Sequence, residues 1–322
     1  MYNKQIWQPT ADLTTLQYRA KVFHKIRAFF YERDVVEVDT PCLSLGSISD
    51  PHIEVLSTQI KTLGKHVTYY LQTSPEYAMK RLLAAGSGSI FQICKAFRHD
   101  ESGCRHNPEF TLLEWYRTGF NHHDLMNEVD ALLQLLLGAA PAQRISYQQL
   151  FLNTCAIDPL ECDVRALQQC AAEHELNMTA PINDKDTLLQ LLLSHVIEPQ
   201  LGFKAPLFIY DFPAAQAALA RINASDPRVA ERFEVYIQGF ELANGFHELT
   251  NAQQQRQRFQ AQQAQRQKLK RTAVAIDQRF INALAHGLPA CAGVAVGLDR
   301  LLMILADTKN IDDVLTFPWQ RA

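Results

Sequence analysis

Arginine, glycine and aromatic residues in two short segments form the pattern in this chain that is best suited to chemistry. The first segment, Phe97–Tyr116 (FRHDESGCRHNPEFTLLEWY), carries Arg98 and Arg105. The second, Gly293–Arg300 (GVAVGLDR), ends on Arg300 after two glycines that permit close approach of the backbone. Arginine guanidinium groups bind phosphate oxygens through paired N–H donors. Together the segments predict a triphosphate-binding surface, and a charged hairpin with internal ion pairs is the alternative for the first one.

A third segment, residues 232–249 (RFEVYIQGFELANGFHEL), supplies carboxylates. If Gln238–Gly239 is a two-residue turn, Tyr236 pairs with Glu241 across the hairpin. Glu234 then lies diagonally from Glu241 on the same face. Two carboxylates without a softer ligand favour Mg²⁺ bridged to phosphates over zinc. The segment therefore predicts a magnesium site, and the alternative is a set of ordinary surface charges.

Two further features of the sequence determine in which direction polar side chains point from the predicted strands. Asn244–Gly245 is expected to turn or bulge the second strand of this hairpin and so re-aim Glu248. In residues 110–116, strand alternation places every second side chain on the same face. One face suits the floor of a site better than a core, because it carries Phe110, Leu112, Glu114 and Tyr116.

Hydrophobic periodicity predicts the elements that hold these residues. Residues 16–33 predict a helix, and a short strand follows it. Residues 67–73 and 90–98 predict strands, with a helix between them whose N-cap is Ser74 and whose first residue is Pro75. The apolar stripe of the first helix is formed by Val22, Ile26, Phe29 and Phe30.

The rest of the chain carries little recognisable chemistry. Residues 121–205 are mainly leucine-rich helical patterns and are expected to be an insertion between core strands. Residues 252–271 predict a polar helix rich in Arg, Lys and Gln, interpreted as a solvated face or as a docking surface for an acidic partner. No internal repeat or linker divides the sequence, so a single domain over 1–322 is the simplest organisation.

Bulk composition limits the classes of function. The net charge of −3 gives no global basic field, which argues against indiscriminate binding to nucleic acid. The seven cysteines form no C-x-x-C pair, which suits a reducing cytosol and predicts neither a structural metal nor a disulfide. No apolar run approaches about 18 residues and the N-terminus is not signal-like, so we expect a soluble cytoplasmic protein without membrane contact.

The three segments together resemble the class II aminoacyl-tRNA synthetases, in particular the lysyl-tRNA synthetases. Phe97–Tyr116 is similar to motif 2 and Gly293–Arg300 to motif 3, while residues 16–41 resemble motif 1, the dimer interface of that family. RHNPEF, ELANGFHEL and G-x-D-R are specific when they occur together, and the similarity covers nearly the whole chain. The resemblance implies an α+β fold, with an antiparallel sheet flanked by helices. It also implies a homodimer that activates a carboxylate with ATP and Mg²⁺.

The resemblance assigns roles to individual residues. It implies catalytic roles for Arg98, Glu241 and Arg300, and Mg²⁺ binding by Glu234 and Glu241. ATP binding is implied for Arg98, His99, Asp100, Arg105, His106, Asn107, Phe110, Glu241, Leu242, Gly297 and Arg300. Amino-acid binding is implied for Ser74, Pro75, Glu76, Tyr116, Asn244, Phe246, Glu248 and Ala295.

Within these sets, the resemblance distinguishes the parts of each substrate. Arg98 is expected at the α-phosphate, with adenine between Phe110 and Arg300. Glu76 is expected to bind the amino group near the substrate carboxylate. The distal ammonium of a lysine-like substrate is assigned to Tyr116 and Glu248.

Two departures from the lysyl-tRNA synthetase pattern bear on the substrates. The glycine of that family is Ala295 here, and we hypothesise that the added methyl favours a shifted amino group, as in (R)-β-lysine. The family's Arg-Asn-Glu is Arg98-His99-Asp100 here, so the adenine contact is left to Asp100 or to Glu101. The choice between α- and β-lysine, the acceptor-docking residues and the general base for transfer stay open at this stage.

Few residues precede the motif-1-like segment, so we expect no anticodon-binding domain and no recognition of tRNA. In this the chain resembles the stand-alone lysyl-tRNA synthetase paralogues that attach (R)-β-lysine, or less well lysine, to a lysine side chain of elongation factor P. One alternative is another stand-alone class II ligase acting on RNA or on a small molecule, and a second is a catalytically silent regulator. One small-molecule ligase of this kind would be an amino-acid amide synthetase, and the lysine-pocket pair Tyr116 and Glu248 argues against it. The silent regulator is disfavoured by the joint presence of Arg98, Glu241 and Arg300.

Overall fold

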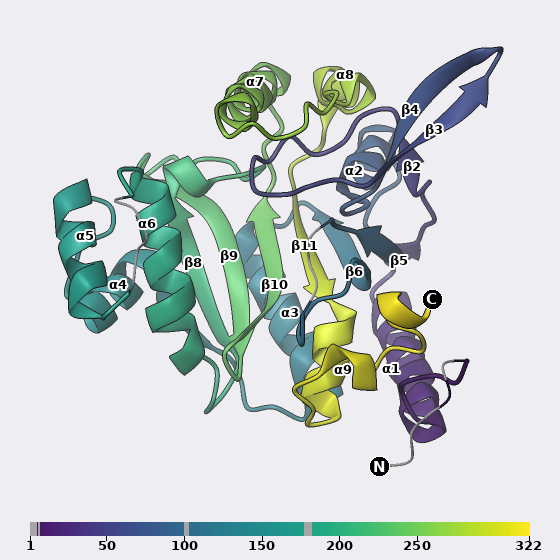
Figure 1. Cartoon of the computed structure of the whole chain (residues 1–322), viewed down its shortest axis with the longest axis horizontal. Coiled ribbons are helices and arrows are strands. Elements are labelled where there is room, and N and C mark those ends of the chain that lie inside the picture. The colour runs from purple at the N-terminus through teal and green to yellow at the C-terminus, as the bar shows by residue number, and fades with distance from the viewer. Residues whose placement is uncertain (1–4, 6, 100–102, 177–181) are drawn as a thin grey trace. The chain divides into compact units, whose positions relative to one another are not determined.

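The computed structural model describes residues 5, 7–99, 103–176 and 182–322. The chain forms two compact units, one made of Met1–Gly119 and Thr250–Ala322 and the other of Phe120–Leu249 (Figure 1). We call them unit 1 and unit 2 and describe each by itself. The single-domain organisation expected over 1–322 stays a prediction. None of the helices in the described ranges is both long and apolar enough to cross a membrane.

Unit 1 contains a mixed sheet. Its strands, in neighbouring order, are β1 (Val36–Glu37), β5 (Ile90–Phe97), β6 (Glu109–Thr118) and β11 (Cys291–Gly297). The β5/β6 and β6/β11 pairs are antiparallel as predicted, but β1 runs parallel to β5, so the antiparallel prediction is wrong at this edge. A parallel pair needs a long crossover connection, and residues 38–89 provide it. A separate small sheet contains β2 (Leu43–Ser44), β4 (Lys65–Leu71) and β3 (Ser57–Thr62).

The first helix of unit 1 confirms the predicted apolar stripe. Val22, Ile26, Phe29 and Phe30 are all buried on it, and Phe30 stacks on Phe91 of β5 with ring centroids 4.6 Å apart. Stacked aromatic rings of this kind fix the helix on the sheet. The helices of this unit are α1 (Leu13–Tyr31), α2 (Glu76–Ala84), α7 (Ala252–Lys268), α8 (Gln278–Gly287) and α9 (Leu298–Leu305). Two 3₁₀ turns, Ile311–Asp313 and Trp319–Arg321, complete it.

Unit 2 also contains a mixed sheet. Its strands, in neighbouring order, are β10 (Phe240–His247), β9 (Val229–Ile237), β8 (Leu207–Pro213) and β7 (Gln143–Ser146). β7 runs parallel to β8, so the antiparallel prediction is wrong here too, and the helices between these two strands form the crossover. The helices are α3 (His122–Leu137), α4 (Tyr147–Cys155), α5 (Val164–Glu173) and α6 (Lys185–Leu192). A π-helical turn (Leu193–Ile197) and two 3₁₀ turns (Glu198–Gln200, Ala214–Gln216) follow.

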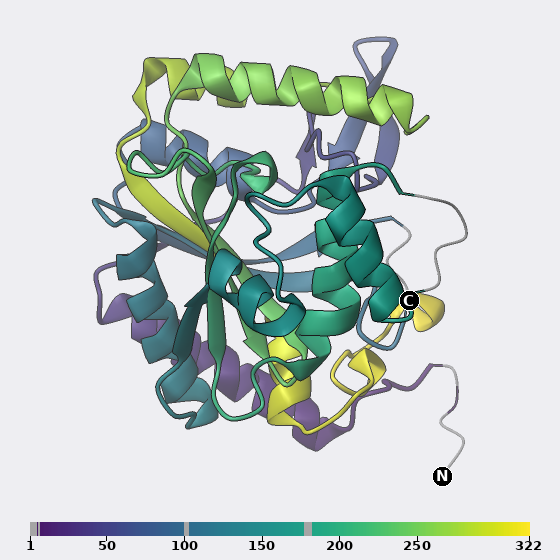
Figure 2. The same ribbon diagram turned by 90° about the vertical axis from the view of Figure 1, so that its left-hand side faces the viewer.

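The helices of unit 2 lie on both faces of its sheet, as Figure 2 shows, with α3 on one side and α4–α6 on the other. Strand alternation explains this arrangement. Ile209 and Tyr236 point into the core formed with α4–α6. The neighbouring Phe208 pairs with Phe233 instead, with ring centroids 5.7 Å apart. Both faces are therefore apolar, as a sheet covered on both sides requires.

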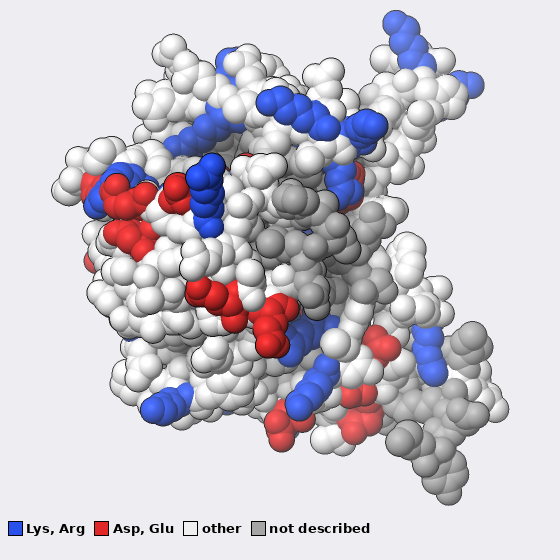
Figure 3. All heavy atoms as spheres, turned by 60° about the vertical axis from the view of Figure 1, so that its left-hand side comes forward, with Lys and Arg blue, Asp and Glu red and all other residues white. Residues whose placement is uncertain are grey.

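The polar helix predicted over 252–271 is α7, and it is only partly a solvated face. Lys and Arg side chains gather near it at the top of the view in Figure 3. Arg266, however, is buried and donates hydrogen bonds to the backbone oxygens of Asp50 (2.6 Å) and Ile53 (2.8 Å). The interpretation as a solvated face is wrong for this residue, because a loop distant in the sequence covers it.

Candidate active site

Arg98 and Phe110 lie together at the adjoining ends of β5 and β6. The backbone N–H of Arg98 donates to Pro108 O (2.9 Å), and its guanidinium lies over the Phe110 ring, 5.1 Å from the centroid. A guanidinium over an aromatic face is held in place by the ring quadrupole. The two residues therefore present a positively charged group beside a flat apolar surface, which suits a phosphate next to an aromatic base.

The loop after Arg98 approaches the start of α9. Arg300 Nη2 lies 2.7 Å from His106 Nε2, and both Arg105 and His106 are exposed. Gly297 is the N-cap of α9 and, lacking a side chain, leaves the backbone accessible there. His99 is exposed, and its N–H donates to Glu54 O (3.0 Å). The predicted adenine contacts Asp100 and Glu101 lie outside the described residues.

Asn107 is buried, and its side chain hydrogen-bonds to backbone groups of the same protein. Its Nδ2 donates to Glu109 O (2.6 Å), and its Oδ1 accepts from the Trp319 N–H (2.9 Å). These bonds hold the C-terminal residues against the start of β6. The assignment of Asn107 to ATP stays a prediction.

Sequence reasoning missed a buried anchor beneath this group. Asp299 pairs with Arg19 of α1 (2.6 Å) and accepts from the Thr111 N–H of β6 (2.6 Å). Arg19 also donates to Thr111 Oγ1 (2.7 Å). The anchor joins α1, β6 and α9, and so fixes the neighbouring Arg300. Only the adjacency of Asp299 and Arg300 in the sequence pointed to it.

The start of α2 presents Glu76 beside a cavity of about 230 Å³. The helix begins one residue later than predicted, with Pro75 as N-cap, while Ser74 Oγ accepts from the Glu76 N–H (3.2 Å). Proline has no backbone N–H, so the cap residue itself has no donor that needs a partner. The cavity is lined in part by Gln72, Ser74, Pro75, Glu76, Arg81 and Asp277. Three residues predicted to bind the amino acid thus share one concave surface.

Glu76 is paired with a residue that sequence reasoning missed. The Lys80 ammonium lies 2.5 Å from Glu76 Oε1, one helical turn further along α2, and Lys80 is 1% exposed. The same ammonium lies 5.9 Å from the centre of the Tyr116 ring. The i, i+4 spacing of Glu76 and Lys80 was the available sequence signal.

Tyr116, Glu114 and Ala295 form a second polar group in unit 1. The Tyr116 hydroxyl donates to Glu114 Oε1 (2.6 Å), which confirms that these two side chains share a face of β6. Ala295 of β11 lies directly opposite Glu114 in the register and is half-buried. Glu114 was predicted on this face but was given no role in the site. The methyl of Ala295 therefore borders the polar face of β6.

The carboxylate hairpin of unit 2 confirms the predicted turn. Gln238 and Gly239 both have positive φ, 51° and 72°, as a two-residue hairpin turn requires. Tyr236 pairs with Glu241 as predicted. The bulge, however, lies between Glu241 and Ala243 rather than at Asn244–Gly245, so that Asn244 stands opposite Glu234.

Glu234 is a buried carboxylate in a crowded group of acids. Burial, with a contribution from Glu241, raises its pKa to about 7, against the opposing effect of Arg232. Its oxygens accept from Arg232 Nη2 and from the Tyr236 hydroxyl (2.6 Å), which also donates to Glu198 (3.1 Å). Buried like charges make the ionised form costly, and a divalent cation relieves that cost. The hard oxygen ligands and the raised pKa both fit Mg²⁺.

The other predicted residues of the hairpin strand differ in burial. Glu248 is 2% exposed. Phe246 is partly buried and packs on a small cluster of alanines. Asn244 Oδ1 accepts from Arg232 Nε (3.3 Å), and Leu242 is buried at the bulge. A buried Glu248 selects strongly for a cationic group when it binds one, because an uncompensated buried charge is expensive.

Comparison with known proteins identifies the family. The model of the class II tRNA synthetases (D, K and N) matches residues 9–321. Three similar proteins, all called elongation factor P–(R)-β-lysine ligase, come from Vibrio cholerae, Haemophilus influenzae and Salmonella typhi. The first is 53% identical over 98% of both chains, the second 51% over 97% of both, and the third 50% over 98% of both. The chain belongs to the class II tRNA synthetase family (D, K and N).

Proposed function

We propose that this protein uses ATP to activate (R)-β-lysine, and less well lysine, and transfers it to a lysine side chain of elongation factor P. The observation that carries the proposal is about 50% identity over nearly the full length of both chains to proteins called elongation factor P–(R)-β-lysine ligase. The arrangement of Arg98, Phe110 and Arg300 in unit 1 supports ATP as the activating substrate.

In the activation step, a carboxylate oxygen of the amino acid attacks the α-phosphorus of ATP. The bond to the pyrophosphate oxygen breaks, and pyrophosphate leaves with the electron pair. Arg98 neutralises the α-phosphate, Phe110 supports adenine, and Arg105 and Arg300 bind the distal phosphates. Because both reactants are anions, positioning and charge neutralisation dominate, and no protein nucleophile is required.

Glu234 and Glu241 of the hairpin are the proposed Mg²⁺ ligands. The bound ion would supply positive charge to the phosphate oxygens. The raised pKa of Glu234, caused by burial and then by Glu241, supports this assignment, since its ionised form would be stabilised by a bound cation. Arg232 supplies part of that charge by its ion pair with Glu234.

Glu76 is the proposed partner of the amino group near the reacting carboxylate. Its position at the rim of the cavity at the start of α2 supports this role. The Tyr116 hydroxyl is assigned to the distal ammonium and is oriented by Glu114. Glu248 is assigned to the same ammonium because it is a buried carboxylate. The charge requirement excludes substrates with an apolar end.

In the transfer step, the neutral amine of the acceptor lysine attacks the carbonyl carbon of the adenylate. The bond to AMP breaks, AMP leaves, and the attacking nitrogen loses a proton. Desolvation of the acceptor lysine in the complex favours its neutral form. We place the reaction in the cytoplasm, and we propose a homodimer formed through residues 16–41, where Tyr31 and Val36 are exposed.

The test offers two acceptors to the same activated amino acid. The purified protein is incubated with ATP, Mg²⁺ and (R)-β-lysine, with either elongation factor P or total tRNA. Intact mass is expected to increase by one β-lysyl group on elongation factor P and to stay unchanged when its acceptor lysine is replaced. Attachment of β-lysine to RNA instead would support another class II ligase. No label on either acceptor and no adenylate would support a silent regulator.

A further inference from the structure

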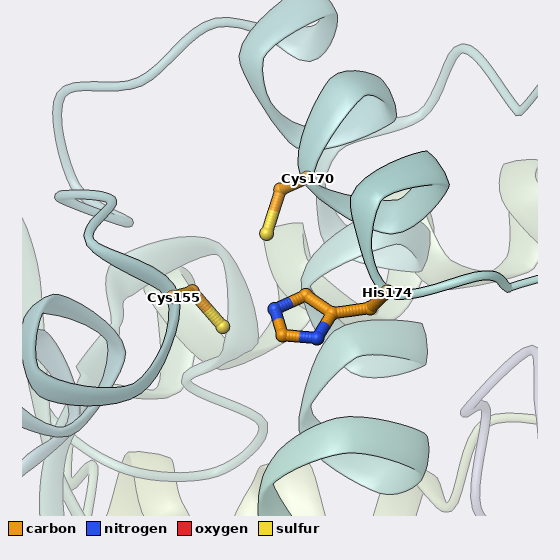
Figure 4. Close-up of side chains that lie close together, drawn as sticks. All are labelled: Cys155, Cys170 and His174. Atoms are coloured by element: carbon orange, nitrogen blue, oxygen red, sulfur yellow. The ribbon is translucent and has the colours of Figure 1, made fainter.

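Two thiols and an imidazole meet in unit 2, in the helical region that the proposed reaction does not use. Cys155 Sγ, Cys170 Sγ and a ring nitrogen of His174 all lie within 4.8 Å of one another. Figure 4 shows the three side chains pointing toward one another from α4 and α5. No two of these residues are closer than four positions in the sequence, so the cluster contains no short metal-binding motif such as C-x-x-C.

Local structure explains why these side chains converge. Cys155 is the last residue of α4, where the left-handed Ala156 ends the helix. Cys170 and His174 are four residues apart at the end of α5, so they share one helical face. The left-handed Ala156 ends α4 directly after Cys155, and burial in the core fixes Cys170.

The cluster is buried on one side and open on the other. Cys170 is 3% exposed within the core of unit 2, Cys155 is partly buried against that core, and His174 is exposed. An ion bound here would have protein ligands on its inner side and access to water on its outer side. Entry from solvent requires no opening of the core.

We propose that Cys155, Cys170 and His174 bind one Zn²⁺ ion, with a water molecule as the fourth ligand. Two thiolates and one imidazole are a ligand set that zinc accepts in tetrahedral geometry. Each thiol releases one proton on binding, and the two thiolates balance the charge of the ion. The occupied site is therefore neutral, and a neutral site is less costly to bury than a charged one.

Burial disfavours the thiolate forms of Cys155 and Cys170 when no metal is bound. Burial raises the pKa of Cys170, and it raises the pKa of Cys155 to about 12. Neutral thiols are poor nucleophiles, which argues against a catalytic or redox role for the metal-free cluster.

The ion would join the C-terminal ends of α4 and α5. Because a ligand that binds only the folded state stabilises it by mass action, zinc should raise the unfolding temperature of the protein. The residues that we assign to ATP and to the amino acid lie on other elements. Zinc binding is therefore expected to leave the rate of adenylate formation unchanged.

A second cluster of metal-ligand types, His122, Glu231 and His247, is less suited to a cation. His247 Nδ1 lies 2.5 Å from Glu231 Oε2, so these two groups already satisfy each other. Arg221 Nη1 lies 3.3 Å from His247 Nε2 and places a positive charge beside the cluster. No comparable cation appears among the contacts described for Cys155, Cys170 and His174.

The test uses the full chain, reduced and stripped of metal by a chelator. Zinc affinity and stoichiometry are measured by competition with a chromophoric chelator, and Co²⁺ serves as a spectroscopic probe. We expect one equivalent with Kd below about 1 μM and a thiolate-to-cobalt charge-transfer band. Zinc should also raise the unfolding temperature.

Matched variants assign the binding to these side chains. Cys155→Ser and His174→Gln should each weaken zinc binding by about tenfold or more and reduce the thermal shift accordingly. Cys162→Ser, at a partly buried thiol that packs on the same core, should leave both unchanged. His174 is exposed, so its substitution does not threaten folding. Absence of binding, or binding that survives in both ligand variants, would overturn the proposal.

Discussion

The Lys80 ammonium lies 2.5 Å from the Glu76 carboxylate, one helical turn along α2. Lys80 is buried, and its ammonium also faces the ring of Tyr116. Two side chains that we assign to the amino acid, Glu76 and Tyr116, are thus linked by one internal cation. The carboxylate that we assign to the substrate's amino group is held in position before any substrate binds, which lowers the entropy lost on binding.

Lys80→Met should lower the free energy of unfolding by about 3 kcal/mol, because it removes the cation from a largely buried carboxylate. Glu76→Gln should also destabilise, since it leaves the buried Lys80 ammonium without its charged partner. The double variant should lose at least about 1 kcal/mol less than the sum of the two, because neither charge is then left alone. Urea unfolding of the four proteins measures this coupling. Strictly additive effects would show that the pair does not hold the helix turn.

Arg98→Ala should reduce the rate of amino-acid-dependent ATP–pyrophosphate exchange by about 10²–10³, as expected for loss of a preorganised donor at developing charge. The matched control is Arg144→Ala, which removes an arginine of unit 2 that hydrogen-bonds to Asn127. The control should exchange at the wild-type rate. A loss of less than about fivefold in Arg98→Ala would contradict the assignment of Arg98 to the α-phosphate.

Ala295→Gly should move the preference of the enzyme toward α-lysine, because it removes a methyl beside the polar face formed by Glu114 and Tyr116. The measurement is the ratio of kcat/KM for (R)-β-lysine and α-lysine in the exchange assay. A glycine in a strand costs roughly 0.5–1 kcal/mol, so Ala292→Gly on the same strand controls for that effect. An unchanged ratio in Ala295→Gly would contradict the hypothesis that the Ala295 methyl favours (R)-β-lysine.

His122 gives unit 2 a defined response to acid. Burial, followed by the neighbouring His123 and His247, lowers the pKa of His122 from 6.5 to about 3. The unfolded chain therefore binds a proton near pH 6.5 that the folded protein takes up only near pH 3. Stability contributed by neutral His122 is full above pH 6.5 and is lost as the pH falls toward 3, by up to about 1.4 kcal/mol per pH unit.

Removal of the imidazole tests this dependence. His122→Phe should flatten the fall in unfolding free energy between pH 6.5 and 4, as measured by urea unfolding at each pH. His52→Gln, at an exposed position, should leave the slope unchanged. The slope is the readout, so a change in overall stability of His122→Phe does not affect the conclusion. A wild-type slope in His122→Phe would show that other groups cause the acid sensitivity.

Parts of the structure that depend on local pattern were predictable. The period of 3.6 residues gave the buried stripe of α1, and Gln238–Gly239 gave the turn and the pairing of Tyr236 with Glu241. The position of the bulge was not predictable, because it depends on which backbone bonds the two strands form. Parallel edge pairs were missed because alternation has the same period in parallel and antiparallel strands.

Contacts between distant segments account for most of what the sequence did not reveal. Arg266 resembles its exposed neighbours in α7, and its burial comes from carbonyl groups of Asp50 and Ile53. The predicted absence of a structural metal rested on spacing alone, which does not reveal that Cys155 and Cys170 meet in space. The pairing of Lys80 with Glu76 was predictable, since their spacing of four residues places both on one helix face.

The measurement that tests the central claim most directly is amino-acid-dependent ATP–pyrophosphate exchange, with α-lysine and (R)-β-lysine compared side by side. Exchange depends on formation of the adenylate and requires no acceptor, so it isolates the activation step. We predict exchange with both amino acids and a higher kcat/KM with (R)-β-lysine. The account is contradicted if neither amino acid supports exchange while the protein is folded and Mg²⁺ and ATP are present.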